Sequence, residues 1–147
     1  MATDRIEREI LIQAPRERIW QLLTEAEHIS RWFGDSTEVD LRPGGQMVFT
    51  WTQYGSHHAR VERVEPPAFF SYRWARQPGE YPAEGNSTLV EFTLTESGSG
   101  TVLRVVETGF ATLKVTEHEK DTAVTENTQG WRNELAELQQ YADTVPS

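Results

Sequence analysis

The chain has 147 residues, of which 37% are hydrophobic and 25% are charged. This length and apolar content are sufficient for one domain with a single core. The 23 acidic and 14 basic residues give a formal net charge of −9, which argues against nucleic acid and anionic membranes as partners, because both attract clusters of Lys and Arg. The chain contains no cysteine, which excludes disulfides, thiolate catalysis and thiolate metal sites.

The N-terminal segment is charged and contains no long apolar run. We therefore predict neither a signal peptide nor a membrane span, and we expect a cytoplasmic location. No internal repeat, low-complexity tract or linker divides the sequence. A single domain over residues 1–147 is expected.

The first elements predicted are a strand and a short helix. Isoleucine recurs at even spacing over residues 6–13, which indicates a strand with one face turned inward. Pro15 suits the first position of a helix, where its missing N–H is not needed, and apolar residues at helical spacing extend this helix to about Leu23.

A second short helix is predicted directly after the first. Thr24 and Glu27 have the spacing of a capping box, in which each side chain accepts a hydrogen bond from the backbone near the other residue. The apolar face of this helix ends in Trp32 and Phe33, and Gly34 terminates it.

The middle of the chain alternates with the period of two that is typical of strands. Residues 42–45 read Arg-Pro-Gly-Gly, which predicts a type II turn within a hairpin. Residues 77–87 collect proline, glycine and asparagine, which predicts a loop long enough to act as a lid. With the first strand, seven strands are expected, the other six near residues 37–41, 47–51, 57–64, 70–74, 88–96 and 101–108.

The last predicted element is a long helix that begins near Asp121. Trp131, Leu135 and Leu138 lie on one face of it. Gly130 interrupts this helix at a cost of about 1 kcal/mol relative to alanine. Two explanations stay open for the glycine: close approach to a strand, or space for a ligand.

One long helix packed across a curved antiparallel sheet predicts an α+β fold that encloses a hollow. We therefore expect the protein to bind a ligand rather than to catalyse a reaction. The inward side chains are the candidate ligand-binding residues. An alternative is that these side chains fill the core by themselves. The candidates are Phe49, Trp51, Tyr72, Trp74, Phe92 and Val105 on strands, Asn127, Trp131 and Leu135 on the last helix, and Trp32 and Phe33 at one end.

Catalytic and metal-binding motifs are scarce in this sequence. His57 and His58 are adjacent in a predicted strand and therefore point to opposite faces, so they cannot share one metal ion. The patterns G-x-S-x-G and H-E-x-x-H and a phosphate-binding glycine loop are all missing. No catalytic residue, metal or cofactor is assigned. The polar groups that could act as an acid, a base or an anion clamp if buried are Tyr54, His57, Tyr72, Arg73 and Glu91.

A series of landmarks carries a resemblance to a known family. These landmarks are Ala14-Pro15, Trp20, Arg31-Trp32-Phe33-Gly34, Pro43-Gly44-Gly45, Pro66, and Gly130-Trp131 with Leu135 and Leu138. Their order resembles the Aha-type family, named for the activator of the heat-shock protein 90 ATPase, within the START-like or SRPBCC superfamily. The resemblance implies a helix-grip fold, in which a seven-stranded antiparallel sheet wraps a long C-terminal helix and encloses a cavity.

The resemblance leaves three functions open. Members of the wider superfamily bind lipids, sterols or polyketides, so the first is binding of a small hydrophobic molecule between sheet and helix, gated by residues 77–87. The second is a cofactor-free cyclase or hydratase acting on a polyketide-like substrate. The third is a co-chaperone-like interaction module, which is expected least because the eukaryotic activators add a separate chaperone-binding domain that this sequence does not contain.

Overall fold

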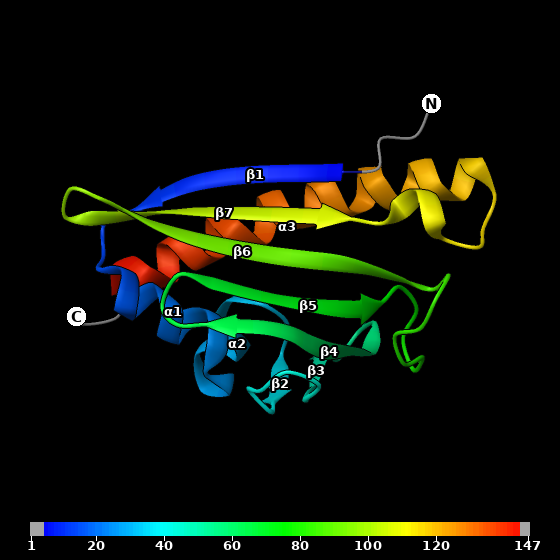
Figure 1. The fold of residues 1–147 in the computed structure, drawn as a ribbon, viewed down its shortest axis with the longest axis horizontal. Coiled ribbons are helices and arrows are strands. Elements are labelled where there is room, and N and C mark those ends of the chain that lie inside the picture. Colours follow the sequence, from blue (N-terminus) through cyan, green and yellow to red (C-terminus); the bar gives the residue numbers. More distant parts are fainter. Residues whose placement is uncertain (1–4, 145–147) are drawn as a thin grey trace.

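The computed structural model describes residues 5–144 and contains three α-helices, one short 3-10 helix and seven strands (Figure 1). In chain order the elements are β1 (Arg5–Ile12), α1 (Arg16–Thr24), α2 (Ala26–Trp32), β2 (Ser36–Val39), β3 (Gln46–Trp51), β4 (Gly55–Glu65), β5 (Phe69–Ala75), β6 (Ser87–Ser97), β7 (Gly100–Thr108), η1 (Phe110–Thr112) and α3 (Glu117–Thr144).

All seven strands form one antiparallel sheet in the order β1-β7-β6-β5-β4-β3-β2. The pairing of β4 with β5 shifts register between Val61 and Arg63. Helix α3 runs across one face of this sheet, and α1 and α2 lie together near one end of it (Figure 1). The predicted α+β helix-grip fold is confirmed. None of the described helices is both long enough and apolar enough to cross a membrane.

Two predicted turn features have different outcomes. The type II turn is confirmed, since Gly44 has φ +83° and the Gly45 amide donates to the Arg42 carbonyl at 2.8 Å. The predicted capping box at Thr24 is wrong. Thr24 is the last residue of α1, where its hydroxyl donates to the Trp20 carbonyl one turn earlier, and the residue that precedes α2 is Glu25, with no side-chain cap.

The long helix begins one turn earlier than predicted. Its first residue is Glu117, and the Thr116 hydroxyl accepts a hydrogen bond from the Glu119 amide at 3.1 Å. A threonine at this position satisfies one of the free amides at a helix N-terminus. The apolar spacing that located the helix in the sequence starts only after this polar first turn.

An aromatic cluster occupies the interior between the sheet and α3. Phe33 lies at its centre, with ring centroids 5.0 to 5.7 Å from those of Phe49, Trp51, Trp74 and Trp131. The space bordered by the neighbouring side chains of α2, β3, β5 and β6 is only about 10 Å³. In this part of the interior the aromatic side chains fill the core.

Candidate functional site

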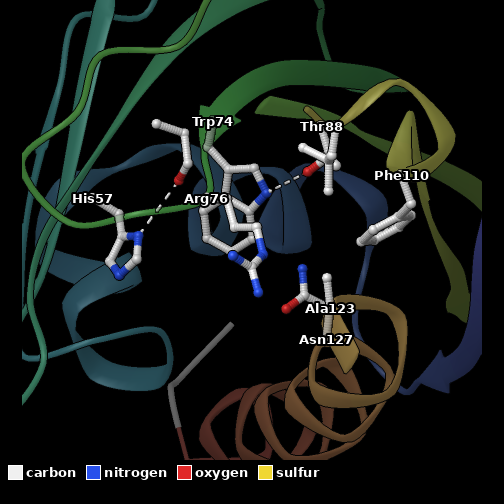
Figure 2. Close-up of a pocket in the computed structure, with 9 residues that line it drawn as sticks. His57, Trp74, Arg76, Thr88, Phe110, Ala123 and Asn127 are labelled. Atoms are coloured by element: carbon white, nitrogen blue, oxygen red, sulfur yellow. Dashed lines mark hydrogen bonds between the residues drawn. The ribbon is translucent and has the colours of Figure 1, made fainter. Parts of the chain in front are cut away.

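A cavity of about 70 Å³ remains at one end of the interior, between β5, β6, η1 and α3 (Figure 2). A space of this size holds roughly five water molecules or a small organic group. The apolar part of the cavity wall includes the side chains of Trp74, Phe110 and Ala123. The full lining is His57, Trp74, Ala75, Arg76, Thr88, Phe110, Leu113, Ala123 and Asn127.

A buried carboxylate lies behind the polar wall of this cavity. Glu107 on β7 is fully buried. Its Oε2 accepts hydrogen bonds from Thr88 Oγ1 at 2.5 Å and from Trp74 Nε1 at 3.0 Å. Its Oε1 accepts from Trp131 Nε1 at 2.8 Å, and Asn127 Nδ2 donates to both oxygens at 3.0 and 3.2 Å.

Burial of a carboxylate is costly unless hydrogen bonds replace its lost water. Four side chains provide those bonds to Glu107, and three of them also line the cavity. Within residues 5–144, no Lys, Arg or His side chain forms an ion pair with Glu107. The carboxylate is therefore held by neutral donors and fixes the position of each one.

His57 lies on the cavity wall opposite Phe110 (Figure 2). Burial lowers the pKa of His57 below its ordinary value of 6.5, so the ring is neutral near pH 7. Its Nδ1 lies 3.5 Å from the Ala75 carbonyl oxygen. His58 points to the other face, where it stacks on Tyr81 with centroids 4.2 Å apart. The prediction that these histidines face opposite sides is confirmed.

A wider groove of about 330 Å³ adjoins the cavity, and Arg76 and Leu113 line both. The segment predicted to be a lid forms part of this groove. Asn86 holds that segment together, since its Oδ1 accepts from the Ala83 amide at 2.7 Å and its Nδ2 donates to the Tyr81 carbonyl at 3.0 Å. The loop is thus anchored by its own hydrogen bonds in this structure.

The comparison with protein families settles the relationship. Residues 13–143 match the family model described as Activator of Hsp90 ATPase homolog 1-like protein. The chain belongs to this family. The family recognised from the landmark residues is therefore confirmed. A search of curated proteins gives no match.

Solved structures related to this Aha-type chain show the same fold. MLL2253 from Mesorhizobium loti has a TM-score of 0.81 and 23% identity, over 97% of this chain and 99% of that one. The Aha1 dimer from Colwellia psychrerythraea has a TM-score of 0.79 and 19% identity, over 99% and 100%. DynU16, a protein of the dynemicin biosynthetic locus, has a TM-score of 0.78 and 21% identity, over 97% of this chain but 48% of its own.

The predicted ligand-binding residues of this Aha-type chain separate into several groups. Trp74 and Asn127 line the cavity. Trp51 is half-buried beside a surface groove that also contains Glu134. Their role in binding stays a prediction. The remaining predicted residues are buried in the core: Trp32, Phe33, Phe49, Tyr72, Phe92, Val105, Trp131 and Leu135.

The polar candidates also separate in the structure. Tyr72 is buried, and burial together with the negative charges of Glu107 and Glu134 raises its pKa well above the ordinary value of 10. Its hydroxyl therefore stays protonated at neutral pH. Tyr54 is exposed. Arg73 and Glu91 are partly exposed and do not line the cavity.

Sequence reasoning missed several residues of the site, above all Glu107. A signal for Glu107 existed, because Leu103, Val105 and Glu107 alternate on one strand and two of them were expected to face inward. Arg76 and Phe110 lie at the ends of elements, where the alternation of inward-facing and outward-facing side chains no longer predicts orientation. Thr88 was predicted to begin a strand, but it belongs to no functional motif in the sequence.

The described residues also bring together one group of potential metal ligands outside the cavity. Ligand atoms of Glu25, Glu27 and His28 lie within 4.8 Å of one another near the junction of α1 and α2. His28 Nδ1 lies 2.7 Å from the Tyr141 hydroxyl. Both glutamates are exposed, which is common for acidic groups that bind no metal. The group contributes nothing to the cavity.

Proposed function

We propose that this Aha-type protein binds a small, largely apolar organic molecule in the cavity beside α3. The observation that carries the proposal is the composition of the wall, in which the rings of Trp74 and Phe110 adjoin the polar side chains of Arg76 and Asn127. Binding sites for small molecules are concave and mostly apolar, with a few polar groups that fix orientation. This cavity has both components.

The size of the cavity limits what it accepts. The inner space of about 70 Å³ is smaller than the cavity of about 150 Å³ that takes up a benzene ring, so it accepts part of a ring or a short chain, and the adjoining groove of about 330 Å³ has room for the remainder of the ligand. Burial of apolar ligand surface supplies the main driving force, at about 25 cal/mol per Å². The polar side chains then select among ligands of similar shape.

One structural relative supports an organic ligand of this kind. DynU16 is a protein of the dynemicin biosynthetic locus. A biosynthetic setting is consistent with a domain that holds a small organic compound, including the lipid- or polyketide-like class expected from the sequence. Its identity to this chain is 21%, so the relative supports the class of ligand rather than any one compound.

Cofactor-free catalysis of the cyclase or hydratase kind is a second candidate, and one observation favours it. His57 lines the cavity, is half-buried and has a pKa lowered by burial. A neutral imidazole on a pocket wall can accept a proton from a bound ligand. Replacement of His57 by Gln should then abolish turnover of a bound compound while binding persists.

The co-chaperone alternative stays a prediction. The large hydrophobic side chains exposed in the described residues are Leu11, Leu41, Tyr54 and Tyr81. Leu11 lies on the edge strand β1, Leu41 follows the opposite edge strand β2, and the two tyrosines lie in separate loops. Nothing in this distribution favours a protein partner over a small molecule.

Thermal-shift measurements test the binding proposal. We expect a panel of fatty acids, sterols, flavonoids and aromatic polyketides to contain a stabilising ligand, which at 100 times its dissociation constant adds about 2.7 kcal/mol. For a domain of this size that stabilisation raises Tm by several degrees. Native mass spectrometry of the purified protein searches in parallel for a bound compound.

A matched pair of variants locates the binding. Ala123 lines the cavity, whereas Ala136 is exposed on the same helix. Ala123→Leu should fill the cavity and remove the ligand-induced shift, and Ala136→Leu should leave it unchanged. Equal shifts in both variants, or no shift from any compound with the wild type, would overturn the proposal.

A further inference from the structure

The side-chain oxygen of Asn127 faces the cavity with its hydrogen-bonding capacity unused. Asn127 Nδ2 donates to both oxygens of the Glu107 carboxylate. A carboxylate only accepts hydrogen bonds, so the nitrogen must face Glu107 and Oδ1 must point elsewhere. Among residues 5–144 the Asn127 side chain forms only the two hydrogen bonds that Nδ2 donates to Glu107, and Asn127 lines the cavity (Figure 2). A ligand with a hydroxyl group can supply the missing donor.

Arg76 presents a cationic group to the same space. Its backbone is fixed by a hydrogen bond from its amide to the Asn86 carbonyl at 2.8 Å. Its guanidinium has no hydrogen bond or ion pair with any described side chain, and Figure 2 shows it directed into the space between Trp74 and Asn127. A guanidinium pairs best with a planar carboxylate, to which it can donate two parallel hydrogen bonds.

Charges in the outer groove restrict where an anion can bind. Glu80, Glu84 and Glu119 line that groove, and they are opposed there by Lys114 as well as by Arg76. Three carboxylates repel a ligand with several negative charges. A single negative charge is favoured at Arg76, where the groove meets the cavity.

We propose that the cavity, together with the adjoining end of the groove, takes a small aromatic molecule that carries one hydroxyl group and one carboxylate. The hydroxyl donates to Asn127 Oδ1, the carboxylate pairs with Arg76, and the ring packs against Trp74 and Phe110. Glu107 does not touch the ligand and acts as a positioning residue, because it sets which end of the Asn127 amide faces the cavity. This inference rests on the proposed binding function and names the class of its ligand.

Probe compounds that differ in one group test the two contacts separately. NMR titrations compare 3- and 4-hydroxybenzoate with their methoxy analogues, which lack the hydroxyl donor, and with their methyl esters, which lack the charge. We expect each change to weaken binding by about tenfold or more, since a hydrogen bond to a ligand or a charge-assisted pair is lost.

Variants assign each preference to one residue. Arg76→Gln should remove the preference for acid over ester and keep the preference for hydroxyl over methoxy. Asn127→Leu should remove the preference for hydroxyl over methoxy and keep the preference for acid over ester. Arg73→Gln is the matched control, because Arg73 lies three residues before Arg76 in the sequence but does not line the cavity, and it should preserve both preferences.

Glu107→Gln provides a readout that a purely structural role would not change. The new NH₂ group can donate to Asn127 Oδ1, which allows the Asn127 amide to turn and present its own NH₂ group to the cavity, while the indole N–H of Trp131 or of Trp74 loses its acceptor. The preference for hydroxyl over methoxy should then disappear or reverse, with no change in the preference for acid over ester. The amide spectrum of each variant shows whether it is folded.

The outcomes separate this inference from the binding proposal. If the probes bind but Asn127→Leu and Arg76→Gln leave both preferences intact, the ligand assignment is overturned. The same holds if no probe binds while another compound gives a shift that Ala123→Leu removes, and in that case cavity binding stands. If neither the probes nor the wider panel bind, both proposals fail.

Discussion

The indole nitrogen of Trp131 donates a hydrogen bond of 2.8 Å to the carboxylate of Glu107, which joins α3 to β7 inside the core. Both residues are almost inaccessible to solvent. A polar bond at this depth gives the helix a defined position along the sheet, because sliding of α3 would remove the hydrogen bonds that Trp131 and Asn127 donate to the carboxylate. The cavity wall depends on the same position.

Trp131→Phe should lower the free energy of unfolding by about 1.5 to 3 kcal/mol, because a hydrogen bond to a charged group is lost while an aromatic ring remains. Trp131→Ala should cost more, at least about 3 to 5 kcal/mol, since it also leaves a hole among Phe33, Trp74 and Phe92. Urea denaturation measures both. A phenylalanine variant as stable as the wild type would contradict the importance of the bond.

Gly130→Ala should stabilise the protein by about 0.5 to 1 kcal/mol, because glycine is a poor helix former. A Cβ atom built at Gly130 meets no atom within 4 Å, so close approach to a strand, one of the two explanations drawn from the sequence, is wrong. Gly45 is the contrasting control. A Cβ there would lie 2.1 Å from the Asp40 carbonyl oxygen, so Gly45→Ala should destabilise the fold in the same urea experiment.

The protonation of Glu134 should make stability depend on pH. Partial burial, and to a lesser extent the charge of Glu137, raise the pKa of Glu134 from 4.5 to about 7. The folded chain holds this proton more tightly than the unfolded chain. The contribution of Glu134 to the free energy of unfolding is therefore fully present below about pH 4.5 and is lost as pH rises through about 7. Glu134→Gln should therefore reduce the fall in Tm between about pH 5 and about pH 8.

The control for this pH profile is Glu126→Gln, at an exposed glutamate on the same helix. It should reproduce the wild-type curve. His57 titrates in the opposite sense because its pKa is lowered, so each variant is compared with the wild type at every pH. Identical curves for Glu134→Gln and the wild type would show that this proton has no effect on folding.

Asn86→Ala should loosen the segment between β5 and β6. The side chain of Asn86 bonds to the backbone of Ala83 and Tyr81, and no other described side chain makes both of these contacts. Amide hydrogen exchange in this segment should become faster while exchange in the strands stays slow, because local opening requires less free energy than global unfolding. Unchanged exchange would mean that this loop is not held by Asn86.

The agreement between sequence and structure is best for elements with regular spacing. The strand near residues 88–96 is observed as Ser87–Ser97, and the one near 101–108 as Gly100–Thr108. The agreement is poorer at helix boundaries. Thr24 resembled an N-cap but belongs to the preceding helix, because the extent of α1 is not encoded in the capping pattern itself.

The candidate site was anticipated only in part. Trp74 and Asn127 were among the predicted residues and line the cavity, whereas Glu107 and Arg76 were not predicted. The sequence indicated which side chains face inward. It did not indicate which of them meet closely and fill space, as Phe33 and Phe49 do.

By itself the sequence determined the order of elements, the single antiparallel sheet with one long helix, and the family, because alternation, helical spacing and turn residues are local properties of the chain. Only the tertiary structure decided where space remains and how the polar groups around it are oriented. Glu107 obtains its donors from β5, β6 and α3, up to 33 residues away along the chain. No local pattern encodes that meeting, because it exists only after the helix has packed on the sheet.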